Sequence, residues 1–147
     1  PNYHRKSLLK IIENEGAQNL SSLINNNKSK ITINLRNNLL FGKNITKETI
    51  KTLRYDLNDL KNRIKSTFEE YDLIIMPTTP QNSFNISNKA PENQANFTSL
   101  ANIADLPSLC LPFYSKKEQP SSLQLISSNM NDEFLIKISS FFEKILQ

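Results

Sequence analysis

Apolar residues recur every three or four positions between residues 46 and 70, which predicts a long amphipathic helix. The apolar stripe consists of Ile50, Leu53, Leu57, Leu60, Ile64 and Phe68. Thr46 is suited to cap the start of this helix, because its hydroxyl can accept a hydrogen bond from a backbone N–H of the first turn. The stripe resembles a coiled-coil seam, but it is short and runs directly into a strand pattern. Packing against a sheet is therefore favoured.

The part of the chain before this helix also shows helical spacing. Residues 7–24 carry two apolar clusters interrupted around Gly16, which predicts either one helix with a weak middle or two short helices. Residues 31–41 form a second helical pattern. We expect that helix to end at Gly42, because glycine readily adopts the left-handed conformation that follows many helix ends.

The sequence Tyr71–Pro80, YDLIIMPTTP, predicts one buried strand with an exposed end. Residues 73–76 form a continuous apolar run, which is typical of a strand covered on both faces, and Pro77 cannot donate a ladder hydrogen bond. Ligands of open α/β sheets lie where strands meet loops, so Thr78 and Thr79 are candidates to face a site. The alternative is a Pro-Thr-Thr-Pro turn whose hydroxyls are solvated.

Two shorter strands and two helices follow along the chain. Residues 109–111 form an apolar run closed by a proline, and residues 122–126 alternate apolar with polar, so both predict strands. Helical spacing predicts a short helix over 97–104 and a final helix capped by Asn131. Residues 82–96 form a polar loop without periodicity, long enough to be functional. The order of helices, strand, loop, strands and helix predicts a mixed α/β fold.

Composition excludes several kinds of site. The 147 residues are enough for one domain, and the two glycines are too far apart for any glycine-rich phosphate loop. Cys110 is the only cysteine and His4 the only histidine, so disulfides, cysteine or histidine metal clusters and histidine triads are not expected. No apolar run reaches the roughly 18 residues of a membrane span, and no secretory signal is visible. We expect a cytoplasmic protein without membrane contact, metal or cofactor.

Charge is unevenly distributed. Residues 1–70 carry 13 Lys/Arg and 7 Asp/Glu, whereas residues 71–147 carry 5 and 7. A basic half can indicate nucleic-acid binding. Here the lysines are scattered among acids without interleaved aromatic residues, which favours a solvated surface and no nucleic-acid partner.

Three stretches in succession resemble the closing third of the amidase signature family. They are YDLIIMPTTP, then NFTSLANIADLPSLCLP at Asn96–Pro112, then PSSLQLISS at Pro120–Ser128. The resemblance implies that residues 1–147 are the C-terminal portion of a single amidase-signature domain, a mixed-sheet α/β/α sandwich with helices flanking a few short strands. Residues 1–70 would be a helical lead-in, and residues 71–147 would supply strands, a cavity-wall loop and the C-terminal helix.

Members of that family hydrolyse amides with a Ser–Ser–Lys triad, in which a serine attacks the amide carbon and a lysine is the base. Those residues lie in a Gly- and Ser-rich run of the family's N-terminal and middle portions, and this chain has no such run. The resemblance therefore assigns no catalytic residue here. It implies the C-terminal portion of a C–N hydrolase, either as a fragment or as half of a split enzyme; the alternative is a non-catalytic binding or scaffold subunit.

By position in the family, five residues are candidates for the wall of the substrate cavity: Thr78, Thr79, Phe97, Thr98 and Asn102. Structural roles, such as capping the short helix or filling the core, remain open for each. The implied partners are a small-molecule amide, once an N-terminal amidase portion completes the site, and a homo- or hetero-oligomer.

The chain departs from the family pattern in two respects. Non-glycine residues stand at five family glycine positions, namely Asp105, Tyr114, Glu118, Ser122 and Ser127. A glycine is often needed where the backbone has positive φ or passes close to another segment, so these positions are expected to be strained or redesigned. Ala95 stands where the family's glutamine-dependent amidotransferase subunits have an acid, which favours a generic amidase over transamidation.

Overall fold

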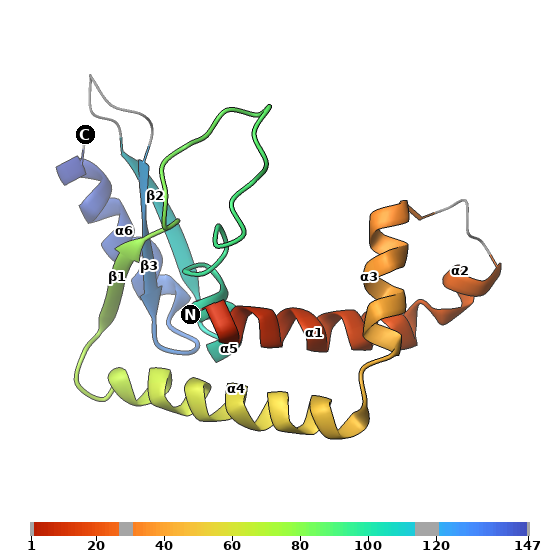
Figure 1. Ribbon diagram of the computed structural model, residues 1–147. Helices are drawn as coiled ribbons and strands as arrows, with labels where there is room; N and C mark the ends of the chain where they lie inside the picture. The colour runs from red at the N-terminus through yellow and green to blue at the C-terminus, as the bar shows by residue number, and fades with distance from the viewer. Residues whose placement is uncertain (1, 27–30, 114–120, 147) are drawn as a thin grey trace. The chain divides into compact units, whose positions relative to one another are not determined.

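The computed structural model describes residues 2–26, 31–113 and 121–146 (Figure 1). They form two compact units: Tyr3–Asp59, called here the helical unit, and Leu60–Gln147 with Asn2, called the sheet unit. The boundary falls inside the long helix α4 (Lys47–Thr67), whereas the sequence suggested a division at residue 70. That the whole chain belongs to one larger domain stays a prediction.

The helical unit contains α1 (Asn2–Asn19), α2 (Ser21–Asn26), α3 (Ile33–Lys43) and the first part of α4. Two helices are present, as one of the two alternatives had it, but Gly16 lies inside α1 and the break falls at Leu20. Its core consists of Ala17, Ile24 and Leu39, with Leu20, Ile31 and Leu40 packed around them. These residues come from α1, α2 and α3 and from the segments that flank them, so they tie the three helices together.

The expectation for Gly42 is wrong, because Gly42 lies inside α3 and has no positive φ. Here the C-terminal end of α3 crosses α1 near residues Glu13 and Asn14 (Figure 1). A Cβ on Gly42 would lie 2.2 Å from the backbone oxygen of Glu13, and the Asn14 side chain donates a hydrogen bond of 2.9 Å to the Gly42 carbonyl. The glycine is needed for this close approach and not for a helix end.

Helix α4 begins as predicted, since the Thr46 hydroxyl accepts a hydrogen bond of 3.2 Å from the backbone N–H of Thr49. In the sheet unit, its residue Ile64 is buried in a cluster with Ile126 of the sheet. Leu60 and Phe68 pack against the same cluster. Packing against a sheet is therefore confirmed for this end of the helix, and a coiled-coil seam is not its role.

The described sheet has three antiparallel strands in the order β1 (Leu73–Pro77), β3 (Ser121–Ser127) and β2 (Ser108–Phe113). All three predicted strands are therefore present. In this order β1 is an edge strand. The predicted cover on both of its faces is incomplete, because Ile75 is 46% exposed.

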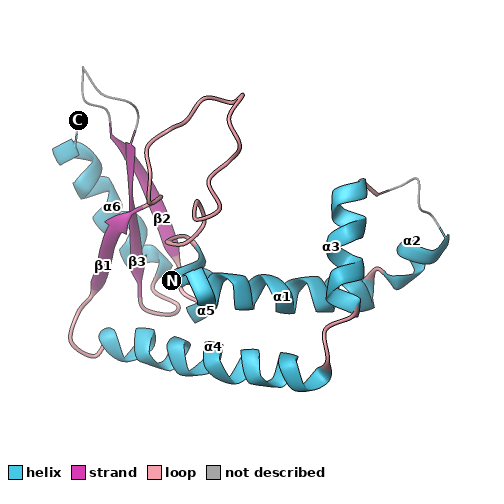
Figure 2. Ribbon diagram, viewed as in Figure 1, coloured by secondary structure: helices cyan, strands magenta, loops and turns pink. Residues whose placement is uncertain are grey.

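Helices pack on both faces of the sheet, and Figure 2 shows α6 running alongside the strands. On one face, α6 (Asp132–Leu146) places Leu135 against Leu111 and Leu125. On the other face, α5 (Ser99–Ala104) and the end of α4 pack on Ile126. The layers of helix, sheet and helix confirm the mixed α/β fold. No helix of the described part is long and apolar enough to cross a membrane.

Asn131 precedes α6 as predicted, but its side chain does not form the expected cap. Its backbone oxygen accepts a hydrogen bond of 3.1 Å from the N–H of Leu135, while its side-chain amide donates to the Ser128 hydroxyl. The Asn131 backbone oxygen also accepts from the hydroxyl of Ser127, which is fully buried. The amide is therefore used to fix the turn before the helix.

Asp105 confirms that one family glycine position needs an unusual backbone. It ends α5 in the left-handed conformation, with φ 52° and ψ 53°. Ser122 and Ser127 lie in β3 without positive φ, so the same explanation does not apply to them. Tyr114 and Glu118 lie outside the described residues.

Candidate functional site

One backbone hydrogen bond joins the end of β1 to the start of β3, and a second hydrogen bond fixes the turn that follows β1. The backbone N–H of Thr78 donates to the Ser122 carbonyl at 3.0 Å. The Thr79 hydroxyl donates to the Gln81 carbonyl at 2.8 Å. Both threonines are half-buried, so the Pro-Thr-Thr-Pro segment is a fixed part of the sheet end and its hydroxyls are not fully solvated.

Three buried side-chain oxygens in this region have no hydrogen-bond partner in the structure: Thr78 Oγ1, Gln81 Oε1 and Gln124 Oε1. A buried polar atom without a partner costs about 1–3 kcal/mol, so proteins rarely leave several together. An amide oxygen can only accept a hydrogen bond, whereas the threonine hydroxyl can donate or accept. The region is therefore suited to a group that brings N–H or O–H donors.

Gln124 is the most deeply buried of these residues, with 1% of its surface exposed. It lies in the central strand, paired with Met76 on one side and Cys110 on the other. Because side chains alternate along a strand, Gln124 shares a face of the sheet with Ile126 and with Thr78 at the end of the neighbouring strand. That face is the one on which α5 packs.

The remaining predicted residues lie at the start of α5: Phe97 and Thr98 precede the helix, and Asn102 lies in it. The loop after β1 leads to it, as the pink segment in Figure 2 shows. Thr98 occupies the N-cap position, but its hydroxyl makes no cap bond and instead donates to the Ala95 carbonyl at 3.4 Å. The Asn102 amide is exposed and donates to the Thr98 carbonyl at 3.5 Å, while Phe97 is half-buried. A capping role for the Thr98 side chain is therefore wrong.

The five predicted residues thus form two local groups. Thr78 and Thr79 lie at the sheet end, and Thr98 is hydrogen-bonded to Asn102 at the start of α5, with Phe97 beside it in sequence. Both groups belong to the sheet unit.

The sheet end also encloses a small cavity of about 270 Å³. Its lining residues are Pro77, Thr79, Gln81, Asn82, Ser83, Ser121, Ser122 and Leu123.

The sequence did not single out Gln81 or Gln124. The only sequence signal for Gln124 was its place as a polar residue in the alternating SLQLI pattern.

Charged groups near α5 do not form a catalytic pair. Lys61 donates a hydrogen bond to the Asp105 carboxylate, and this bond holds the pKa of that carboxyl below its usual value. Asp105 lies at the surface, with 68% of its side chain exposed. Within the residues that the structure describes, no group of three His, Cys, Asp or Glu side chains could hold a metal ion.

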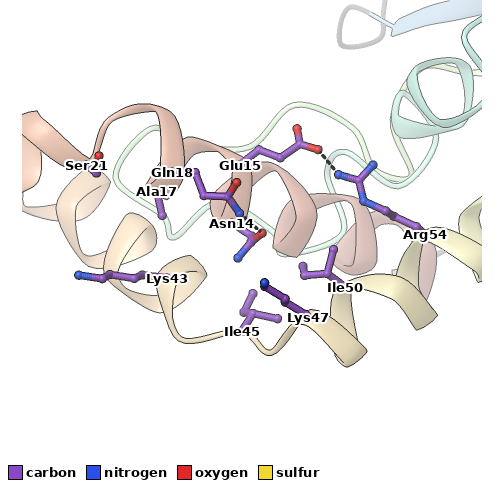
Figure 3. A pocket seen from close by; sticks show the side chains of 10 residues that line it. All are labelled: Asn14, Glu15, Ala17, Gln18, Ser21, Lys43, Ile45, Lys47, Ile50 and Arg54. Carbon is purple, nitrogen blue, oxygen red and sulfur yellow. Dashed lines mark hydrogen bonds and ion pairs between the residues drawn. The ribbon is translucent and has the colours of Figure 1, made fainter.

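A larger cavity, of about 620 Å³, lies in the helical unit (Figure 3). It is lined by Asn14, Glu15, Ala17, Gln18, Ser21, Lys43, Ile45, Lys47, Ile50 and Arg54. Arg54 donates to the Glu15 carboxylate at one end, and Gln18 donates to the Asn14 side chain at 3.0 Å. None of these residues was predicted as part of a site.

Comparison with known proteins identifies the family. The family model described as Amidase matches residues 4–136. One glutamyl-tRNA(Gln) amidotransferase subunit, from Staphylococcus epidermidis, is 29% identical over 89 residues, which are 57% of this chain and 18% of that protein. Its counterpart from Sulfurihydrogenibium sp. is 30% identical over 103 residues, which are 67% of this chain and 20% of that protein. This chain therefore spans about a fifth of the length of these curated relatives.

Solved structures share the fold at low sequence identity. The crystal structure of an amidase superimposes with a TM-score of 0.85 at 14% identity, covering 98% of this chain and 36% of that one. A bacterial aryl acylamidase of the amidase signature family superimposes with a TM-score of 0.76 at 15% identity, covering 97% and 33%. With the family model matched over residues 4–136 and the same fold in these structures, this chain belongs to the amidase family.

Proposed function

We propose that this chain is the C-terminal portion of a hydrolase that cleaves carbon–nitrogen bonds of amides, and that its Ser–Ser–Lys residues lie outside this chain. The observation that carries this proposal is the set of buried oxygens without partners at the end of β1, in a chain that matches the amidase family model. Those oxygens have no hydrogen-bond donor among the residues that the structure describes. A bound amide and the rest of the protein are the sources that an incomplete amidase site would use.

The wall of the substrate cavity would then combine two local groups. Thr78 and Thr79 would contribute from the sheet end, and Phe97, Thr98 and Asn102 from the start of α5. The Thr78 hydroxyl has no partner among the described residues, and the exposed Asn102 amide makes only the 3.5 Å bond to the Thr98 carbonyl, so both could orient a polar substrate group. Phe97 would provide apolar contact.

Three of the four buried serines of the described chain support structural roles, whereas the hydroxyl of the fourth, Ser139 in α6, has no hydrogen-bond partner among the described residues. Ser7, Ser99 and Ser127 each donate a hydrogen bond to a backbone carbonyl, at 3.0, 3.2 and 3.3 Å. A serine nucleophile needs a base within hydrogen-bond reach, and these hydroxyls are instead directed at the backbone. We therefore expect the 147-residue chain alone to hydrolyse no amide.

Simple hydrolysis is favoured over transamidation. The sequence relatives carry the name of an amidotransferase subunit, but Ala95 replaces an acid expected just before the Phe-Thr pair of such subunits. The second candidate function is a non-catalytic binding or scaffold subunit that keeps the fold. The replaced glycine positions, including the left-handed Asp105, favour it. In either case we infer a cytoplasmic protein that works within a homo- or hetero-oligomer.

The proposed cavity wall is tested by Thr98→Val in an enzyme completed with an N-terminal amidase portion. If the hydroxyl contacts substrate, its loss should cost about 1–3 kcal/mol of transition-state stabilisation, and kcat/KM should fall by the corresponding factor. The melting temperature should not change. The hydroxyl's hydrogen bond to Ala95 is long, so little stability should be lost. A lower melting temperature with intact kinetics would place Thr98 outside the wall.

A further inference from the structure

The cavity of the helical unit combines cationic ends with an apolar middle. Figure 3 shows Lys43 reaching toward one end, on the side of Ser21, and Arg54 at the other end. The apolar side chains of Ile45 and Ile50 lie between those ends. At about 620 Å³, the cavity has the volume of a typical small-molecule site.

The charge in this cavity is not balanced by its own residues. Glu15 is the only carboxylate among its described lining residues, and Arg54 already pairs with it. Neither Lys43 nor Lys47 forms an ion pair with another described residue. Two ammonium groups therefore lack a counter-charge within the described part of the chain.

Amide groups beside Lys47 provide further donors. Asn14 is held in place, because its side chain donates to the Gly42 carbonyl at 2.9 Å and accepts from Gln18. The second N–H of the Gln18 amide is not used in that bond. Figure 3 shows the Lys47 ammonium on the side of the cavity where Asn14 and Ile45 lie.

We propose that this cavity binds a small organic dianion, with an acidic group at each end of an apolar stem. One acidic group would be held by Lys43 at one end, and the other by Lys47 and the Gln18 amide near the middle of the cavity, while the stem contacts Ile45. A single surface ion pair contributes little to affinity, so both ends and the stem are needed for useful affinity. This proposal does not rest on the proposed amide hydrolysis.

The test is titration of the full 147-residue chain with linear dicarboxylates of increasing length, followed by calorimetry and by the NMR signal of the Gln18 side-chain amide. Affinity should depend on chain length and should exceed that of monocarboxylates of equal length. Lys43→Gln and Lys47→Gln should each weaken binding about threefold, and the double variant about tenfold. Lys51→Gln is the matched control, since Lys51 is an exposed lysine of α4 outside the cavity lining.

Far-UV circular dichroism checks that the variants keep their helices. Lys43→Arg and Lys47→Arg retain the charge and should retain binding. If a glutamine variant unfolds, the affinity of the arginine variants is measured in its place. Equal affinity for monocarboxylates, an equal effect of Lys51→Gln, loss of binding in folded arginine variants or the absence of saturable binding would each overturn the proposal.

Discussion

Gly42 lies against the backbone of Glu13, so closely that a Cβ on Gly42 would be 2.2 Å from the Glu13 oxygen. Real Cβ atoms do not approach other atoms to this distance, and the backbone cannot rotate away as a side chain can. The crossing of α1 and α3 therefore depends on a hydrogen at this position.

We predict that Gly42→Ala destabilises the helical unit. Alanine favours a helix over glycine by about 1 kcal/mol, but separating the two backbones should cost about 1–3 kcal/mol more than that gain. The measurement is the free energy of unfolding in urea, followed by circular dichroism.

Gly16→Ala is the matched control for Gly42→Ala. A Cβ on Gly16 would meet only the end of the Leu39 side chain, at 2.9 Å, and that side chain can move. The higher helix propensity of alanine should then roughly offset the cost of moving the Leu39 side chain, so the free energy of unfolding should be nearly unchanged. A Gly42→Ala variant as stable as the Gly16→Ala variant would contradict the close crossing.

The ion pair between Lys61 and Asp105 should make stability depend on pH. The hydrogen bond from Lys61 lowers the pKa of Asp105 in the folded chain. The carboxylate therefore contributes stability above its unfolded pKa, and this contribution is lost as pH falls through the lower folded pKa. Because Asp105 is exposed, the contribution should be only about 0.2–1 kcal/mol.

Asp105→Asn tests this pair, because asparagine tolerates the left-handed backbone and removes the charge. The variant should be slightly less stable than the parent at neutral pH, and the two should converge as pH falls through the lowered pKa of Asp105 in the folded chain. Lys61→Gln should behave in the same way. A difference that stays constant from neutral to acidic pH would show that the pair contributes no stability.

Thr78→Val should separate stability from activity. Valine has the shape of threonine, and the Thr78 hydroxyl is buried without a partner, so the isolated chain should be unchanged or more stable by up to about 1–3 kcal/mol. In a completed enzyme, the same change should lower kcat/KM about tenfold or more if substrate bonds that hydroxyl. Urea unfolding and steady-state kinetics measure the two effects.

Thr79→Val provides the contrast, because its hydroxyl already donates to the Gln81 carbonyl at 2.8 Å. Losing that bond should cost about 1 kcal/mol of stability in the isolated chain. Equal destabilisation by the two substitutions would mean that the Thr78 hydroxyl has a partner within the fold.

The outer edge of β1 should make the isolated chain self-associate. Ile75 is 46% exposed there, beside unpaired backbone groups of an edge strand. We expect binding of apolar dyes and concentration-dependent sedimentation, both reduced by Ile75→Lys. Ile86→Lys, in the loop outside the sheet, should have less effect. A monomer with a sharp melting transition would instead favour a self-sufficient domain and the scaffold function.

The sequence was informative wherever the cause of a structure is local. The period of the long helix, its Thr46 cap and the three strands follow from residue patterns, and the structure has them within a few residues. The left-handed Asp105 was anticipated from a family glycine, since the backbone requirement survives the substitution.

Features set by contacts distant in sequence were not predictable in this way. Gly42 had the position of a helix end, and only the crossing of α1 shows why it is glycine. Gln124 alternates with apolar neighbours as an exposed residue would, but β3 is the central strand and both of its faces are covered. The same limit explains why Gln81 was missed: its burial depends on the folded sheet end.

The central claim is that this chain completes an amidase site whose catalytic residues lie elsewhere. The most direct measurement is amide hydrolysis after mixing the 147-residue chain with a polypeptide that carries the Ser–Ser–Lys portion, repeated across a salt series. We predict that neither part is active alone and that the mixture is. The activity should be little weakened by salt, because an interface between halves of one core is mainly apolar. Stable association of the two parts without any amide turnover would contradict the account and favour a non-catalytic role.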